Sequence, residues 1–66
     1  MKVTINGEAK EIPDGLTVRH LLEHLAMRPE RVAIERNLEI LPRAKWNETS
    51  VEANDRYEIV HLVGGG

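Results

Sequence analysis

One stretch of the 66-residue chain has the pattern of an amphipathic helix, and this single helix constrains the fold more than any other feature. Its apolar side chains recur at i, i+3, i+4 and i+7, on one helical face: Val18, Leu21, Leu22 and Leu25. The hydroxyl of Thr17 is placed to cap the N-terminus of the helix. Pro29 disfavours helical geometry at Arg28, so we expect the helix to end near Ala26 or Met27. One helix can cover only one face of a sheet, so the other face stays open.

Strand patterns lie on both sides of the helix. Before it, Val3 and Ile5 alternate with polar residues, and Asn6-Gly7 is a strong signal for a two-residue hairpin turn because both residues tolerate positive φ. A second strand over residues 8–12 then returns beside the first, and its weak alternation indicates an edge strand. After the helix, apolar alternation predicts three more strands, over residues 32–35, 38–41 and 56–63.

This order of hairpin, helix and strands favours one architecture. The last strand reaches the centre of the sheet most simply if it lies parallel to the first strand, through a right-handed crossover. The result is the ubiquitin-like β-grasp, an α+β fold with a mixed sheet and one main helix on one face. We expect residues 1–63 to form this domain and residues 64–66 to form a flexible C-terminal tail.

The sequence finishes with Val63-Gly64-Gly65-Gly66, directly after an apolar run. Glycine populates more backbone conformations than any other residue, so a terminal glycine triplet stabilises no fold. It offers a thin peptide that can enter a channel too narrow for a Cβ atom and present the α-carboxylate of Gly66 to another protein. The alternative interpretation is a frayed chain end.

The alternation in the last strand also predicts a contact surface. Alternate residues should face the helix, which turns Val60 and Leu62 outward on the open sheet face, next to the tail. We predict that Val60, Leu62 and Val63 bind a partner protein. Two alternatives stay open. Either the loop around Trp46 covers this face, or a bulge inverts the alternation.

The composition excludes several classes of protein and site. The chain has no cysteine, which excludes disulfides, thiolate zinc sites and a cysteine nucleophile. Its net charge is −2 with both signs interspersed, which argues against nucleic acid or a membrane surface as the partner. The first residues have the pattern of a strand and lack the features of a signal peptide or a transmembrane span, so we expect a cytoplasmic protein.

No set of side chains predicts catalysis, so we expect a non-enzyme that itself binds no metal or cofactor. His20 and His24 lie four residues apart on the predicted helix, but a third ligand is missing from their face, and we expect both to face solvent. His61 shares the parity of Ile59 and is predicted to cover the end of the core. The unusual group is the α-carboxylate of Gly66. It is a poor electrophile, which a partner must first convert to a mixed anhydride, most simply an acyl-adenylate made from ATP.

Three segments of the chain stand out together: Val32-Ala33-Ile34-Glu35-Arg36-Asn37, then Glu39-Ile40-Leu41-Pro42-Arg43 with Trp46, and Tyr57-Glu58-Ile59-Val60-His61-Leu62-Val63-Gly64-Gly65-Gly66. With these segments the chain resembles the ThiS family, the sulfur carriers of bacterial thiamine biosynthesis. The resemblance covers essentially the whole chain. It departs from the family pattern mildly at the Asn54-Asp55 turn, where a glycine is often found.

The resemblance implies a β-grasp fold and a series of partners. An E1-like, ThiF-like adenylyltransferase would activate Gly66 with ATP. The C-terminus would then become a thiocarboxylate, with sulfur drawn from cysteine through a desulfurase, and a ThiG-like thiazole synthase would receive that sulfur. Gly65 and Gly66 would form the functional tail, with Gly64 as a spacer. ATP would belong to the activating enzyme.

Three other functions stay open at this point. MoaD-like carriers for molybdopterin synthesis are related, but they are usually longer and end in P-P-V-x-G-G, whereas His61-Leu62-Val63 precedes the glycines here. A ubiquitin-like modifier would join its C-terminus to lysines through an isopeptide bond. A β-grasp binding module, such as a TGS domain, would need no free C-terminus.

Overall fold

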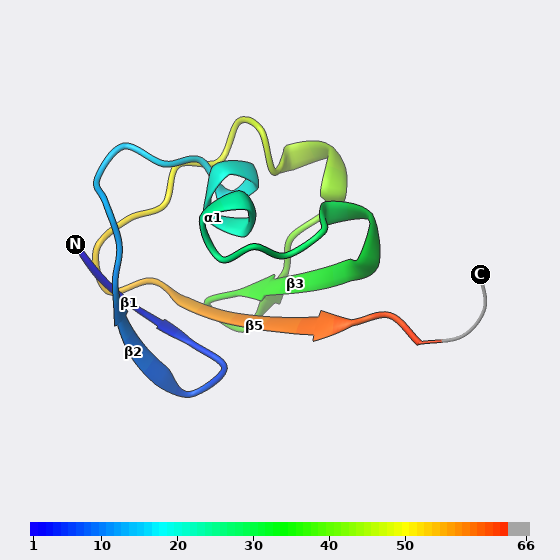
Figure 1. The fold of residues 1–66 in the computed structure, drawn as a ribbon, viewed down its shortest axis with the longest axis horizontal. Helices are drawn as coiled ribbons and strands as arrows, with labels where there is room; N and C mark the ends of the chain where they lie inside the picture. Colours follow the sequence, from blue (N-terminus) through cyan, green and yellow to red (C-terminus); the bar gives the residue numbers. More distant parts are fainter. Residues whose placement is uncertain (64–66) are drawn as a thin grey trace.

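The computed structural model describes residues 1–63, which form a sheet with helix α1 on one face (Figure 1). Five strands lie in the spatial order β2-β1-β5-β3-β4. The strands are β1 (Lys2–Ile5), β2 (Glu8–Glu11), β3 (Val32–Arg36), β4 (Glu39–Ile40) and β5 (Arg56–His61). The helices are α1 (Val18–His24) and two short 3-10 helices, η1 (Pro29–Arg31) and η2 (Arg43–Lys45). The predicted mixed sheet with one main helix on one face is confirmed.

Strand β5 occupies the centre of the sheet. It runs parallel to β1, with Ile5 opposite Tyr57, and antiparallel to β3, with Ile34 opposite Ile59. The predicted parallel pairing of the first and last strands is therefore confirmed. The strand itself ends at His61, before the predicted end at residue 63. Because β5 is hydrogen-bonded to β1 on one side and to β3 on the other, the strand that leads to the C-terminal segment is held firmly in the sheet.

Helix α1 begins where the sequence predicts. The backbone N–H of His20 donates a 3.2 Å hydrogen bond to Oγ1 of Thr17, which is the N-cap. The helix ends at His24, slightly before the predicted end at Ala26 or Met27. Ala26 adopts a left-handed φ of 59°, which terminates the helix before Pro29 is reached.

The hydrophobic core fills the space between α1 and one face of the sheet. From the helix, it receives the fully buried side chains Val18, Leu21 and Leu22. Trp46 joins this core at 2% exposure, and its indole N–H donates a 3.0 Å hydrogen bond to the carbonyl of Leu41. The segment around η2 lies on the same side of the sheet as α1 (Figure 1). The alternative in which the Trp46 loop covers the outward face is therefore excluded.

Candidate functional site

Apolar side chains face solvent at the end of β5. Val60 is 60% exposed, Leu62 54% and Val63 96%. Val60 faces outward on the open sheet face, as predicted. Leu62 is also exposed, but it lines a hollow with Ala26 and Met27 beside the end of α1, because β5 ends at His61 and its alternation does not extend to Leu62. The role of both residues in binding a partner stays a prediction. The backbone N–H of Leu62 donates a 2.8 Å hydrogen bond to the carbonyl of Arg31, so the chain is held to the domain up to Leu62. The predicted tail, residues 64–66, lies outside the described residues.

Val60 also lines an open groove of about 370 Å³ on the sheet face away from α1. The lining residues are Ala33, Ile34, Glu35, Ile40, Glu58 and Val60. Ile40, at 80% exposure, is the second large apolar side chain of this groove that is exposed, besides Val60. The sequence pattern did not place Ile40 in the candidate site. Only the strand register does so, because Ile40 pairs with Glu35 on β3.

Two carboxylates flank this apolar groove. Glu35 on β3 lies directly opposite Glu58 on β5. Opposed residues on neighbouring strands share a face of the sheet, so both acids belong to the face of Val60 and Ile40. The groove therefore presents apolar side chains bordered by negative charge. Such a surface complements a partner whose own surface is apolar with basic residues at its edge.

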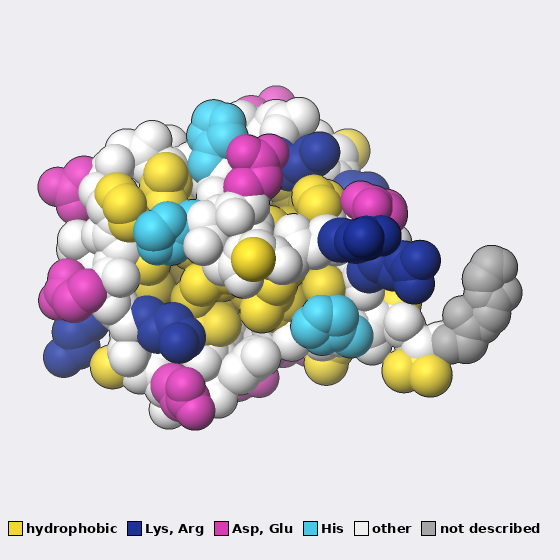
Figure 2. All heavy atoms as spheres, viewed as in Figure 1, with side chains coloured by type: hydrophobic (Ala, Val, Ile, Leu, Met, Phe, Trp, Pro, Cys, Tyr) yellow, Lys and Arg dark blue, Asp and Glu magenta, His cyan; other side chains and the backbone are white. Residues whose placement is uncertain are grey.

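A second hollow of about 330 Å³ lies beside the end of β5. It is lined by Ala26, Met27, Arg28, Arg31, His61 and Leu62, and we call it the basic hollow. His61 is exposed here, so the prediction that it covers the end of the core is wrong. The reason is visible in Figure 1, where β5 continues past the end of α1. Figure 2 shows Lys and Arg side chains gathered on this side of the molecule, with a His side chain beside them.

The remaining candidates for chemistry do not converge. His20 and His24 are both exposed on α1. Within residues 1–63, no three His, Cys, Asp or Glu side chains come together in a way that could hold a metal ion. In the same part of the chain, no helix combines the length and the apolar character that crossing a membrane requires.

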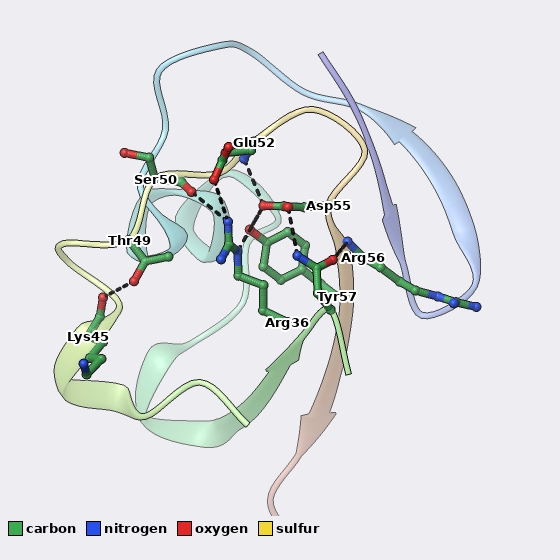
Figure 3. Close-up of polar contacts among 9 residues, drawn as sticks. Arg36, Lys45, Thr49, Ser50, Glu52, Asp55, Arg56 and Tyr57 are labelled. Atoms are coloured by element: carbon green, nitrogen blue, oxygen red, sulfur yellow. Dashed lines mark hydrogen bonds and ion pairs between the residues drawn. The ribbon is translucent and has the colours of Figure 1, made fainter. Parts of the chain in front are cut away.

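The start of β5 is anchored by a buried carboxylate, that of Asp55, which is 6% exposed (Figure 3). It accepts hydrogen bonds from Nε of Arg36 at 3.1 Å, the hydroxyl of Tyr57 at 2.8 Å and Nδ2 of Asn37 at 3.2 Å. The backbone N–H of Glu52 donates a fourth bond, at 2.9 Å. The network ties the 52–55 turn to the end of β3. The sequence predicted only a turn at Asn54-Asp55.

This network favours the charged form of the Asp55 carboxyl and the neutral form of the Tyr57 phenol. Burial acts to raise the pKa of the Asp55 carboxyl, but the hydrogen bonds it accepts and the nearby charge of Arg36 hold that pKa below its ordinary value of 3.8. Burial and the Asp55 carboxylate together raise the pKa of the Tyr57 phenol. The phenol therefore stays protonated at neutral pH and remains a hydrogen-bond donor to Asp55.

The family model of the ThiS family matches residues 3–66. The chain is 32% identical to the sulfur carrier protein ThiS of Escherichia coli (strain K12) over 66 residues, which cover all of both chains. It is 42% identical over its whole length to a thiazole synthase of Paramagnetospirillum magneticum, but it spans only 20% of that relative. A second thiazole synthase, from Magnetococcus marinus, is 38% identical, and the chain again spans 20% of its length.

Among solved structures, the crystal structure of the thiamine biosynthesis protein ThiS from Geobacter metallireducens is similar, with a TM-score of 0.86. It is 33% identical, and the match covers 100% of each chain. The mixed five-stranded sheet with α1 on one face is therefore the ubiquitin-like β-grasp of that structure. The family model, the relative of equal length and the solved structure agree that this chain belongs to the ThiS family of sulfur carrier proteins.

Proposed function

We propose that this chain carries sulfur on the carboxyl group of Gly66 for the formation of a thiazole ring. The observation that carries the proposal is the position of β5. This strand is paired on both sides, and the N–H of Leu62 just after it donates a hydrogen bond to the carbonyl of Arg31. Val63 then leads into Gly64-Gly65-Gly66 in the sequence. A firm strand joined to three residues without side chains suits delivery of a carboxylate into a narrow active site. Membership of the ThiS family supports the same function.

The first step is activation of the carboxylate. A carboxylate oxygen of Gly66 attacks the α-phosphorus of ATP, the acyl-adenylate forms, and pyrophosphate leaves. We assign ATP and the catalytic groups to an E1-like, ThiF-like partner, as the resemblance to the ThiS family implies. The role of the chain is to present its carboxylate in an orientation that the partner can use.

Sulfur transfer follows in two steps. A persulfide sulfur, derived from cysteine by a desulfurase, attacks the acyl carbon, and AMP leaves as the carbon–sulfur bond forms. The product is an acyl disulfide that joins Gly66 to the donor. A thiolate then attacks the donor-side sulfur of this sulfur–sulfur bond, forms a disulfide with the donor, and displaces the thiocarboxylate of Gly66 as the leaving group. The thiocarboxylate that remains on Gly66 is a sulfur nucleophile, and a thiazole synthase can use it to build the ring.

The apolar groove and the neighbouring strand end form the proposed docking surface. Val60 and Ile40 line the groove, and Leu62 and Val63 are exposed in the segment that follows β5. A thiazole synthase is proposed as the acceptor partner because two relatives with that name contain a region similar to this whole chain.

Adenylation and thiolation of the intact chain test the proposal. ATP–pyrophosphate exchange with the adenylating enzyme from the same genome measures the first step, and intact mass measures replacement of one oxygen by sulfur. Deletion of Gly66 should abolish both signals without changing the melting temperature, because the carboxylate then falls short of its site. Gly65→Val should also fail because a β-branched side chain obstructs the approach.

A matched control is Ala9→Val, which adds the same side chain at an exposed position on β2. It should be adenylated as fast as the wild type. Thiolation of the chain lacking Gly66 at the wild-type rate would contradict the proposal. So would a protein isolated from cells whose chain continues past Gly66, because no α-carboxylate would then exist at that residue.

A further inference from the structure

The basic hollow places two arginines and a histidine around one concave surface. Arg28, Arg31 and His61 are all exposed, and Met27 and Leu62 give the hollow a partly apolar floor. The hollow lies on the α1 side of the strand end, whereas the apolar groove lies on the open sheet face. It is therefore a second surface, and Leu62 is the one lining residue that the proposed function already uses.

The backbone that carries these side chains is held in place. The N–H of Arg31 donates a 3.0 Å hydrogen bond to the carbonyl of Arg28, and His61 pairs with Val32 across the β3–β5 ladder. Arg43 reaches over from η2 and donates hydrogen bonds to the carbonyls of Pro29 and Val32. The hollow is thus preorganised, which lowers the entropic cost of binding there.

The charges of the basic hollow are not neutralised within the described residues. The ion pairs among residues 1–63 involve other cations, such as Arg19 with Glu23 and Arg36 with Asp55. Among residues 1–63, no carboxylate oxygen lies within 4.0 Å of the guanidinium of Arg28 or Arg31. The chain as a whole has a net charge of −2, so this positive surface stands out against an acidic background.

The hollow also lies where any partner of the C-terminus must approach. Leu62 lines the hollow, and Gly66, whose carboxyl group the proposed function uses, is three residues after Val63 in the sequence. Three extended residues span about 10 Å at most. An enzyme that grips the Gly66 carboxylate therefore brings its own surface within reach of Arg28 and Arg31.

We infer that the basic hollow docks against an acidic surface at the entrance of the active site that receives the tail. Carboxylates of the adenylating enzyme would sit opposite Arg28 and Arg31, while the apolar groove contacts the enzyme on the other side of β5. Two contacts on opposite sides of one strand would fix the direction in which the tail enters. This inference rests on the proposed function, because it needs an enzyme that takes up the C-terminus.

The test is the association rate of the full chain with the adenylating enzyme from the same genome, measured from 50 mM to 500 mM salt. The double variant Arg28→Glu/Arg31→Glu should associate about tenfold more slowly than the wild type at low salt, because charge complementarity acts mainly on the encounter rate. The difference should shrink at high salt, where screening is strong. The control Lys10→Glu/Arg19→Glu makes the same change in net charge on β2 and α1, away from both surfaces. The association rate of this control variant should fall much less.

Several results would overturn the inference. One is a double variant that associates as fast as the control at every salt concentration while the wild type is adenylated normally, which leaves the proposed function standing. Another is wild-type binding to a 20-base-pair DNA duplex that is lost in the double variant, because the hollow would then serve nucleic acid. A wild-type chain that the enzyme neither binds nor adenylates contradicts the proposed function itself.

A chain with a C-terminal amide separates direct docking from an effect on the Gly66 carboxylate. If the arginines contact the enzyme, the ratio between wild type and double variant should persist when both carry the amide. A ratio that disappears in the amidated pair would show that the arginines act on the carboxylate, and the docking inference would be wrong. Melting curves of both double variants establish that the fold is intact.

Discussion

The hydroxyl of Tyr57 donates a 2.8 Å hydrogen bond to the carboxylate of Asp55, inside the protein and at the start of the central strand. Tyr57 is fully buried and Asp55 is 6% exposed. The same carboxylate also binds Arg36 on β3, so one acidic side chain joins the turn before β5 to the neighbouring strand. This contact positions the strand from which the C-terminus extends.

Replacement of Asp55 by Asn should lower the free energy of unfolding at pH 7 by about 1–3 kcal/mol. The amide keeps the shape of the side chain but loses its charge, and it leaves donors of Arg36 and Tyr57 incompletely bonded. Urea denaturation at pH 7 measures the loss. Glu48→Gln, an exposed acid-to-amide change, is the matched control and should stay within about 0.5 kcal/mol of the wild type.

The cost of Asp55→Asn should depend on pH in a defined direction. The pKa of Asp55 is lower in the folded chain than its ordinary value of 3.8, so its charge stabilises the fold above that pH. The stabilisation is lost as the pH falls through the folded-state pKa. The stabilities of wild type and Asp55→Asn should therefore converge as the pH falls below 3.8 and through the folded-state pKa. A difference that stays constant as the pH falls through this range would show that the charge of Asp55 is not its source.

Leu22→Ala should destabilise the domain by about 2–5 kcal/mol, because the side chain is fully buried between α1 and the sheet. In a domain whose stability is on the order of 5–15 kcal/mol, this is a severe loss. Chemical denaturation measures it. His20→Ala, on the exposed side of the same helix, should cost little. Equal effects of the two changes would contradict the assignment of the buried helix face.

Leu38→Gly should stabilise the free protein by about 0.5–1 kcal/mol. Leu38 has a left-handed φ of 72° in the β3–β4 turn, a conformation that strains a residue with a Cβ atom. Its side chain is 76% exposed. Gly7→Ala is the mirror experiment, because Gly7 has a φ of 83° with no heavy atom within 4 Å of an added Cβ. It should destabilise by about 1 kcal/mol through the backbone alone. Thermal denaturation compares the two, and a loss of stability in Leu38→Gly would contradict the strain argument.

Val60→Asp and Ile40→Asp should each weaken binding to the adenylating enzyme by about tenfold or more while the fold survives. Both side chains line the same groove and are largely exposed, so the free protein loses little when they change. Titration calorimetry measures the affinity, and Ala9→Asp on β2 is the control. Unchanged affinity in both groove variants would show that the groove is not the docking surface.

The sequence by itself determined the elements whose signals are local. The apolar spacing of Val18, Leu21 and Leu22 gives the helix and its buried face, because the 3.6-residue period needs no knowledge of neighbours. Asn6-Gly7 sets the first hairpin, and both residues do adopt positive φ. The two-residue alternation in β5 is also a local pattern, and it predicts that Val60 faces outward.

Only the tertiary structure decided which residues meet across the chain. Asp55 reads as a turn residue in sequence, yet its main side-chain partners include Arg36, 19 residues earlier. Ile40 joins Val60 in one groove because β4 pairs with β3, and β3 with β5. His61 is exposed because α1 stops short of the strand end, and the same geometry brings it beside Arg28 and Arg31. Strand order and register depend on contacts distant in sequence, and no local period encodes them.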